Sequence, residues 1–63
     1  MPIVEITLVQ GRTEEQKSKA AAAITKALHE HLNSTPDHTY VVFQDVAPSN
    51  WAISGALLSE KKK

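Results

Sequence analysis

The sequence predicts an α+β fold in which one long helix joins two parallel strands and a short hairpin follows. Residues 2–9 and 39–46 are rich in β-branched side chains with the alternation of a strand. The intervening residues 14–32 place apolar side chains at the three- and four-residue spacing of a helix. Because the helix crosses between the strands, we expect a parallel pair with a right-handed connection. We find no repeat or linker, so residues 1–63 are interpreted as a single domain.

The first strand presents two different faces. Val4, Ile6 and Leu8 share one face, and the residues that alternate with them lie on the other. A Gln-Gly-Arg run at 10–12 then ends the strand.

The helix is expected to run from Glu14 to Leu32. Thr13, followed three residues later by Gln16, predicts a capping box, and two glutamates in the first turn suit the positive end of the helix dipole. Asn33 can take the left-handed conformation that ends a helix, and a proline three residues later prevents its continuation. The predicted apolar stripe consists of Ala20, Ile24, Ala27, Leu28, His31 and Leu32.

The second strand completes a narrow sheet. Tyr40, Val42, Gln44 and Val46 face one way, and a short hairpin is expected at 51–55. One helix covers only one face of a sheet, so we expect the apolar residues of the other face to meet another subunit.

Chain length also predicts self-association. The 63 residues include no cysteine, so neither a disulfide nor a thiolate metal site can stabilise the fold. Burial would contribute about 90 kcal/mol, whereas ordering the chain would cost about 95 kcal/mol. This balance near zero favours an oligomer.

Charge and hydropathy exclude several classes of partner. Seven basic and seven acidic side chains balance, which argues against binding to nucleic acid or to a membrane surface. No apolar run approaches the roughly 20 residues of a membrane span, and no signal peptide precedes the first strand. We therefore expect a cytoplasmic protein.

Pro2 directly follows the initiator methionine. Removal of Met1, which is usual before a small residue, would leave a secondary amine at the start of the first strand. Such an amine can act as a general base or as a nucleophile through an iminium. Without further context, however, such an opening more often has no functional meaning.

The context comes from a family resemblance. The opening Pro2-Ile3, the run LVQGRTEEQK at 8–17 and the β-α-β order resemble the 4-oxalocrotonate tautomerase family over nearly the whole chain. The resemblance implies a homohexamer built as a trimer of dimers, an isomerase with Pro2 as general base, and no cofactor. The implied substrates are small unsaturated 2-oxo or 2-hydroxy acids such as 2-hydroxymuconate. Related members dehalogenate or hydrate acrylates.

Tautomerisation through a dienol needs a base that is uncharged near neutral pH yet strong enough to take a proton from carbon. Burial of the Pro2 amine and a nearby cation would both lower its pKa. Trp51 and Ile3 can supply an apolar wall and Arg12 the positive charge, with these residues coming from different subunits.

Two further residues match the family pattern. The resemblance assigns Arg12 to the distal carboxylate of the substrate, for which a planar bidentate donor is suited. The alternative is a loop arginine paired with a surface carboxylate. Trp51 falls where the family carries an aromatic residue, usually phenylalanine, beside the proline; it is also interpreted as an anchor of the oligomer interface.

Tyr40 departs from the pattern, because the family has a second arginine there that polarises the 2-oxo group and meets the neighbouring carboxylate. A tyrosine hydroxyl donates a hydrogen bond without a positive charge, so enolate stabilisation is expected to weaken by about 1–3 kcal/mol. This leaves open a non-catalytic subunit, for instance half of a heterohexamer. Ala52 and Ser54 also replace glycines common in the family hairpin, so the hairpin geometry can differ.

The three histidines show no metal-binding pattern. His29 and His31 diverge around the helix, and the sequence contains no His-Glu-x-x-His. Neither aligns securely with the helix histidine of dehalogenase relatives. His38 precedes the second strand and is expected at the surface.

Overall fold

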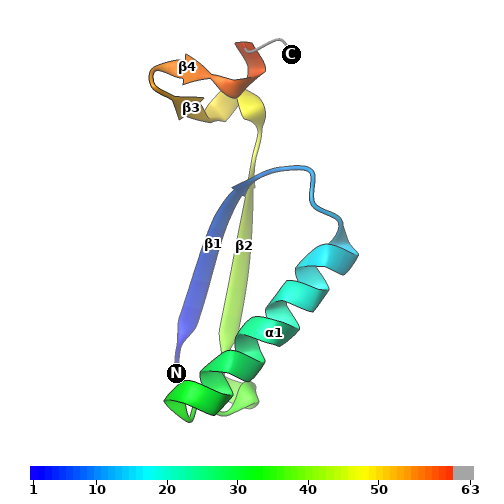
Figure 1. The fold of residues 1–63 in the computed structure, drawn as a ribbon, viewed down its shortest axis with the longest axis vertical. Coiled ribbons are helices and arrows are strands. Elements are labelled where there is room, and N and C mark those ends of the chain that lie inside the picture. The colour runs from blue at the N-terminus through cyan, green and yellow to red at the C-terminus, as the bar shows by residue number, and fades with distance from the viewer. Residues whose placement is uncertain (61–63) are drawn as a thin grey trace.

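The computed structural model describes residues 1–60 and contains the predicted order of elements. Strand β1 (Ile3–Val9) leads through helix α1 (Glu14–Leu32) to strand β2 (Tyr40–Val46), which pairs with β1 in parallel. The helix lies alongside the two strands, and the chain after β2 continues beyond the end of the sheet (Figure 1). The α+β class, the parallel pairing and the bounds of the helix are therefore confirmed.

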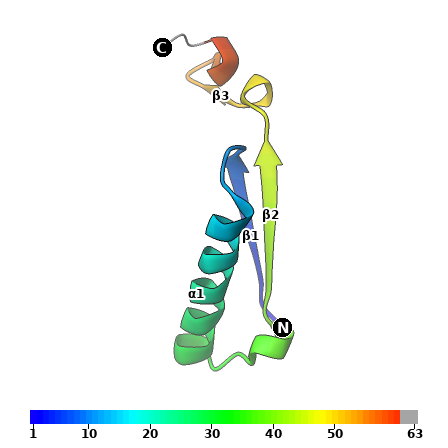
Figure 2. The same ribbon diagram turned by 90° about the vertical axis from the view of Figure 1, so that its right-hand side faces the viewer.

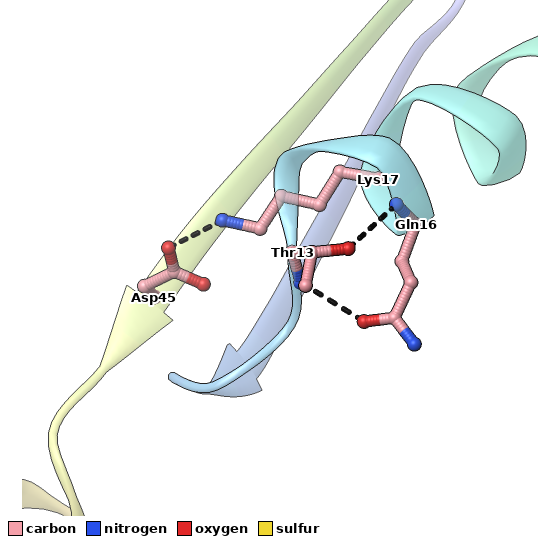
Figure 3. Close-up of polar contacts among 4 residues, drawn as sticks. All are labelled: Thr13, Gln16, Lys17 and Asp45. Atoms are coloured by element: carbon pink, nitrogen blue, oxygen red, sulfur yellow. Dashed lines mark hydrogen bonds and ion pairs between the residues drawn. The ribbon is translucent and has the colours of Figure 1, made fainter.

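Both ends of α1 have the caps that the sequence predicts. Thr13 Oγ1 accepts a hydrogen bond from the Gln16 amide at 3.1 Å, and Gln16 Oε1 accepts one from the Thr13 amide at 2.9 Å (Figure 3). Asn33 takes the left-handed conformation with φ of 60°, and its amide donates to the Leu28 carbonyl. These bonds satisfy backbone groups that a helix end leaves without partners.

An ion pair that the sequence did not predict joins the helix to the sheet. Lys17, in the second turn of α1, contacts Asp45 near the end of β2 through Nζ and Oδ2 (Figure 3). Both side chains are partly exposed, so the pair contributes little to stability and mainly fixes where the helix starts over the sheet.

The helix face that meets the sheet is narrower than predicted. Of the expected stripe only Ile24 and Leu28 are half-buried, whereas Ala20, Ala27, His31 and Leu32 are exposed. Two strands about 5 Å apart cover only a thin strip of a helix. Whether a helix residue is half-buried therefore depends more on whether it faces this strip than on how hydrophobic its side chain is. The half-buried residues are Lys17, Ala21, Ile24, Thr25 and Leu28.

The sheet has one covered face and one open face. Figure 2 shows α1 over one side of the two strands and nothing from residues 1–60 over the other. On the open face Ile3 is 60%, Tyr40 48% and Val42 41% exposed. Strand register places the following residues on this open face: Ile3, Glu5, Thr7, Val9, Tyr40, Val42, Gln44 and Val46.

The C-terminal part forms the predicted hairpin with shifted bounds. Strand β3 (Ala52–Ile53) pairs antiparallel with β4 (Ala56–Leu57), so the hairpin extends past the expected end at Gly55. Ser54 and Gly55 are the two turn residues, with φ of 55° and 84°. A serine thus takes a left-handed conformation that favours glycine.

Three 3-10 turns complete the described chain. They are η1 (Pro36–His38) before β2, η2 (Pro48–Asn50) after it, and η3 (Leu58–Glu60) after the hairpin. No helix within residues 1–60 has the length and apolar character needed to cross a bilayer.

The single chain is extended and has no interior of its own. None of residues 1–60 is buried, and the radius of gyration is 15.0 Å. A compact chain of this length would have a radius of gyration of about 11 Å. The accessible surface is 4894 Å², against about 4,000 Å² for a compact monomer of this mass. Apolar side chains that a monomer would bury therefore remain at the surface, which is the expected form of one subunit of an oligomer.

Candidate active site

The structure brings two of the four predicted site residues together. Pro2 is half-buried just before β1, and the amide of Tyr40 donates a hydrogen bond of 3.0 Å to its carbonyl oxygen. Tyr40 begins β2 and pairs with Ile3, so its side chain lies on the open face beside the start of β1. Pro2 is therefore held against β2 at one end of the sheet.

The turn that precedes Tyr40 is braced from within. The carbonyl of Thr35 accepts bonds from the His38 amide at 3.1 Å and from Thr39 Oγ1 at 2.8 Å. The Thr39 amide donates to the Pro36 carbonyl at 3.2 Å, and Thr35 Oγ1 lies 3.3 Å from His38 Nδ1. His38 is exposed, as expected from the sequence, and occupies the same end of the sheet as Pro2.

Arg12 lies at the opposite end of the sheet, in the turn between β1 and α1. The Gln10 amide donates to the Val46 carbonyl at 2.9 Å, which holds this turn to the end of β2. Gly11 has a φ of 136°, a conformation that side chains rarely adopt. Arg12 follows as an exposed residue and makes no ion pair with any of residues 1–60.

Trp51 also lies beyond the carboxyl end of β2. Its amide donates to the Pro48 carbonyl at 3.4 Å, and its carbonyl accepts a bond of 2.8 Å from the Leu58 amide. These bonds close η2, the hairpin and η3 into one unit, which projects past the tips of β1 and β2 (Figure 1). Trp51 is half-buried within this unit.

One chain alone does not assemble all four residues. Strand β1 has seven residues, which corresponds to about 20 Å between its ends. Pro2 and Tyr40 lie at one end, while Arg12 and Trp51 lie at the other, and residues 1–60 enclose no pocket. A site that contains all four must draw on more than one chain.

Comparison with known proteins agrees with this architecture. The family model of tautomerase enzymes matches residues 2–61. A probable tautomerase of Ralstonia nicotianae is 36% identical over 61 residues, which are 97% of this chain and 94% of that protein. A 2-hydroxymuconate tautomerase of Comamonas testosteroni is 35% identical over 60 residues, 95% of each chain. The chain therefore belongs to the tautomerase family.

Solved structures extend the likeness to three dimensions. A 4-oxalocrotonate tautomerase homologue superposes with a TM-score of 0.95 at 27% identity, over the full length of both chains. A heterohexameric 4-oxalocrotonate tautomerase of Chloroflexus aurantiacus gives a TM-score of 0.88 at 27% identity and covers 98% of this chain and all of its own. The extended β-α-β unit with a projecting hairpin is thus the fold of these proteins.

Proposed function

We propose that this protein is a cofactor-independent isomerase that moves a proton on small unsaturated 2-oxo or 2-hydroxy acids. The Pro2 amine acts as general base after removal of Met1. Family membership supports the reaction class, and the relative from Comamonas testosteroni supports 2-hydroxymuconate-like substrates.

The observation that carries the proposal is the setting of Pro2. The hydrogen bond from Tyr40 fixes its carbonyl, while Met1 is 79% exposed and accessible to removal. Once Met1 is gone, the Pro2 nitrogen changes from an amide, which is not basic, into a secondary amine on a rigid ring. That amine can take a proton from one substrate carbon and return it to another.

The proposed site is shared between chains of a homohexamer. Arg12 from a neighbouring chain binds the distal carboxylate through its guanidinium, and Trp51 supplies an apolar wall near Pro2. Both the cation and the wall favour an uncharged amine and lower the pKa of Pro2. The open sheet face and the extended shape of the single chain support assembly. Six chains of 6.9 kDa give a trimer of dimers of about 41 kDa.

The decisive experiment compares processed and unprocessed chains. Protein purified with methionine aminopeptidase inhibited retains Met1, which intact-mass measurement verifies. We expect this preparation to lose nearly all turnover of 2-hydroxymuconate and phenylpyruvate. Pro2→Ala, which after removal of Met1 has a primary amine in place of the secondary one, should retain some turnover. Full activity of the chain with Met1 would exclude Pro2 as the base.

The second candidate function is that of a non-catalytic partner in a mixed hexamer. Tyr40, a neutral residue beside Pro2, favours it, as does the likeness to a heterohexameric tautomerase. Sedimentation of the protein expressed alone separates the two. A hexamer with tautomerase activity supports the first proposal, and an inactive species smaller than a hexamer supports the second. Activity on haloacrylates instead would assign it to the dehalogenase or hydratase relatives.

A further inference from the structure

One functional group at the Pro2 end of the sheet has no part in the proposed reaction. His38 is the last residue of η1 and lies two residues before Tyr40, whose amide binds the Pro2 carbonyl. Figures 1 and 2 both show the N-terminus beside the turn that leads into β2. The turn that carries His38 therefore lies at the same end of the sheet as Pro2.

The turn holds this imidazole in a defined orientation. Thr35 Oγ1 lies 3.3 Å from His38 Nδ1, and the Thr35 carbonyl already accepts two other bonds within the turn. When the Thr35 hydroxyl donates to Nδ1, the ring proton of a neutral imidazole resides on Nε2. Nε2–H is then a donor, and no hydrogen bond joins it to another of residues 1–60.

The other polar groups at this end leave one requirement unmet. Tyr40 offers a single neutral hydroxyl, and the acidic side chains of Asp37 on η1 and Glu5 on the open face would repel an anion. A 2-oxo acid carries a carboxylate directly beside the carbon that reacts. Within one chain this carboxylate has no arginine donor near Pro2, because Arg12 lies about 20 Å away at the other end of β1, and the Arg12 of a neighbouring chain is assigned to the distal carboxylate.

We propose that His38 determines substrate specificity by donating a hydrogen bond from Nε2 to the carboxylate that adjoins the 2-oxo group. This inference rests on the proposed function and extends it. His38 binds the carboxylate that all 2-oxo acids share, whereas Arg12 binds a distal carboxylate that only dicarboxylates have. The substrate class is therefore 2-oxo acids in general, with monocarboxylates bound at the Pro2 end alone.

Two substitutions separate this role from a structural one. His38→Asn places its amide near the position of Nδ1 and keeps the contact with Thr35, but it removes the outward donor. His38→Gln reaches the position of Nε2 and keeps the donor, but it gives up the Thr35 contact. His31→Asn, on an exposed position of α1, is the control.

We expect KM to rise about tenfold in His38→Asn for both phenylpyruvate and 2-hydroxymuconate, the loss of one hydrogen bond to a charged group. His38→Gln and His31→Asn should keep KM within about twofold of the unmodified protein, with kcat little changed in all three. Sedimentation verifies that each variant assembles normally. If His38→Asn binds normally, or if His38→Gln is impaired as much as His38→Asn, the inference is wrong.

A binding experiment distinguishes failure of this inference from failure of the proposed function. The probe is 3,3-dimethyl-2-oxobutanoate, a 2-oxo acid that cannot enolise, and the readout is fluorescence of Trp51, the single tryptophan. An active enzyme whose affinity for the probe is unchanged in His38→Asn overturns the inference alone. An inactive protein whose affinity falls about tenfold in His38→Asn, but not in His38→Gln, overturns the reaction and supports the inference. If the probe does not bind, the inference is overturned, and measured turnover alone decides the proposed function.

Discussion

The two ends of the β1–β2 sheet are built in different ways. At the Pro2 end, backbone and side-chain bonds between Thr35 and Tyr40 fix the surroundings of the proline within one chain. At the Arg12 end, β1 is followed by a turn that contains Gly11, and β2 is followed by the hairpin that projects past the sheet. The proposed base is therefore positioned locally, while the proposed recognition groups are presented outward to another chain.

This difference has a physical origin. The Pro2 end needs only hydrogen bonds between neighbouring backbone segments, which residues close to β1 and β2 supply. The hairpin unit has only two two-residue strands, and an isolated hairpin is marginally stable in water. It gains stability when its exposed side chains, such as Ile53 at 50% exposure, are covered by a neighbour. In the proposed hexamer, assembly would thus stabilise the same elements that are proposed to complete the site.

The largest predicted effect tests whether the two ends of one site come from different chains. A chain that retains Met1 lacks the proposed base, and a processed Arg12→Ala chain lacks the guanidinium that we propose binds the distal carboxylate of the substrate. Mixed hexamers contain sites that join the intact Pro2 of one variant to the intact Arg12 of the other. Random mixing in equal amounts should restore about a quarter of the full activity towards 2-hydroxymuconate at low substrate concentration.

The control for this experiment is each variant unfolded and refolded alone, which should stay inactive. Restoration should appear after refolding together or after coexpression. Mixing without unfolding is a second control, which measures any exchange of chains between assembled hexamers. If the mixture is no more active than the average of its components, all site residues belong to one chain and the proposed division is wrong.

The sequence predicted local features well. Thr13 and Gln16 identify the helix start, because their two reciprocal hydrogen bonds depend on only four consecutive residues. Asn33 identifies the helix end, because asparagine readily takes the left-handed conformation found there. It predicted the covered helix face less well, because Ala20 and Ala27 are apolar yet lie outside the strip that two strands can cover. Burial of such residues depends on packing that no local pattern contains.

The sequence proposes the candidate site as a set of residues, which remains a prediction, but it does not give their arrangement. Pro2, Arg12, Tyr40 and Trp51 follow from the family pattern, whereas their division between two ends of the sheet follows from the length of β1. The turn around His38 was missed because a single histidine before a strand carries no signal. Its contact with Thr35 could have been suspected from the Thr-Pro-Asp-His run, in which proline favours a tight turn.

Arg12→Ala should produce the next largest effect, restricted to dicarboxylates. Loss of a bidentate bond to the distal carboxylate should raise KM for 2-hydroxymuconate about a hundredfold, and KM for phenylpyruvate should change by less than about threefold. Arg12→Lys keeps the charge without the planar geometry and should fall between these values. Equal effects on both substrates would show that Arg12 acts through structure or through the pKa of Pro2.

Tyr40→Arg changes the Pro2 end of the sheet and should raise activity, whereas Arg12→Ala lowers it. A cation beside the 2-oxo group stabilises the developing enolate, so kcat/KM on 2-hydroxymuconate should rise about tenfold. The same charge disfavours protonation of the Pro2 amine and lowers its pKa, so the acidic limb of the kcat/KM profile should move to lower pH. Tyr40→Gln, which replaces the phenol with a flexible uncharged amide, is the control. An assembled Tyr40→Arg protein with unchanged rate and pH profile would mean that residue 40 does not face the reacting group.

The smallest predicted effect concerns the turn of the hairpin. Both turn residues have positive φ, 55° at Ser54 and 84° at Gly55, the conformation in which Asn-Gly is strongly preferred. Ser54→Asn should therefore stabilise the protein by about 0.5 kcal/mol, whereas Gly55→Ala should destabilise it by about 1 kcal/mol. Apart from the adjacent residues, no atom of residues 1–60 lies within 4 Å of a Cβ placed at Gly55, so within one chain the cost of Gly55→Ala comes from backbone strain. Urea unfolding at one fixed protein concentration measures both changes, since dilution by itself destabilises an oligomer. Ser59→Asn, outside the turn, should leave stability unchanged. A destabilising Ser54→Asn would mean that the assembled hairpin uses a different turn.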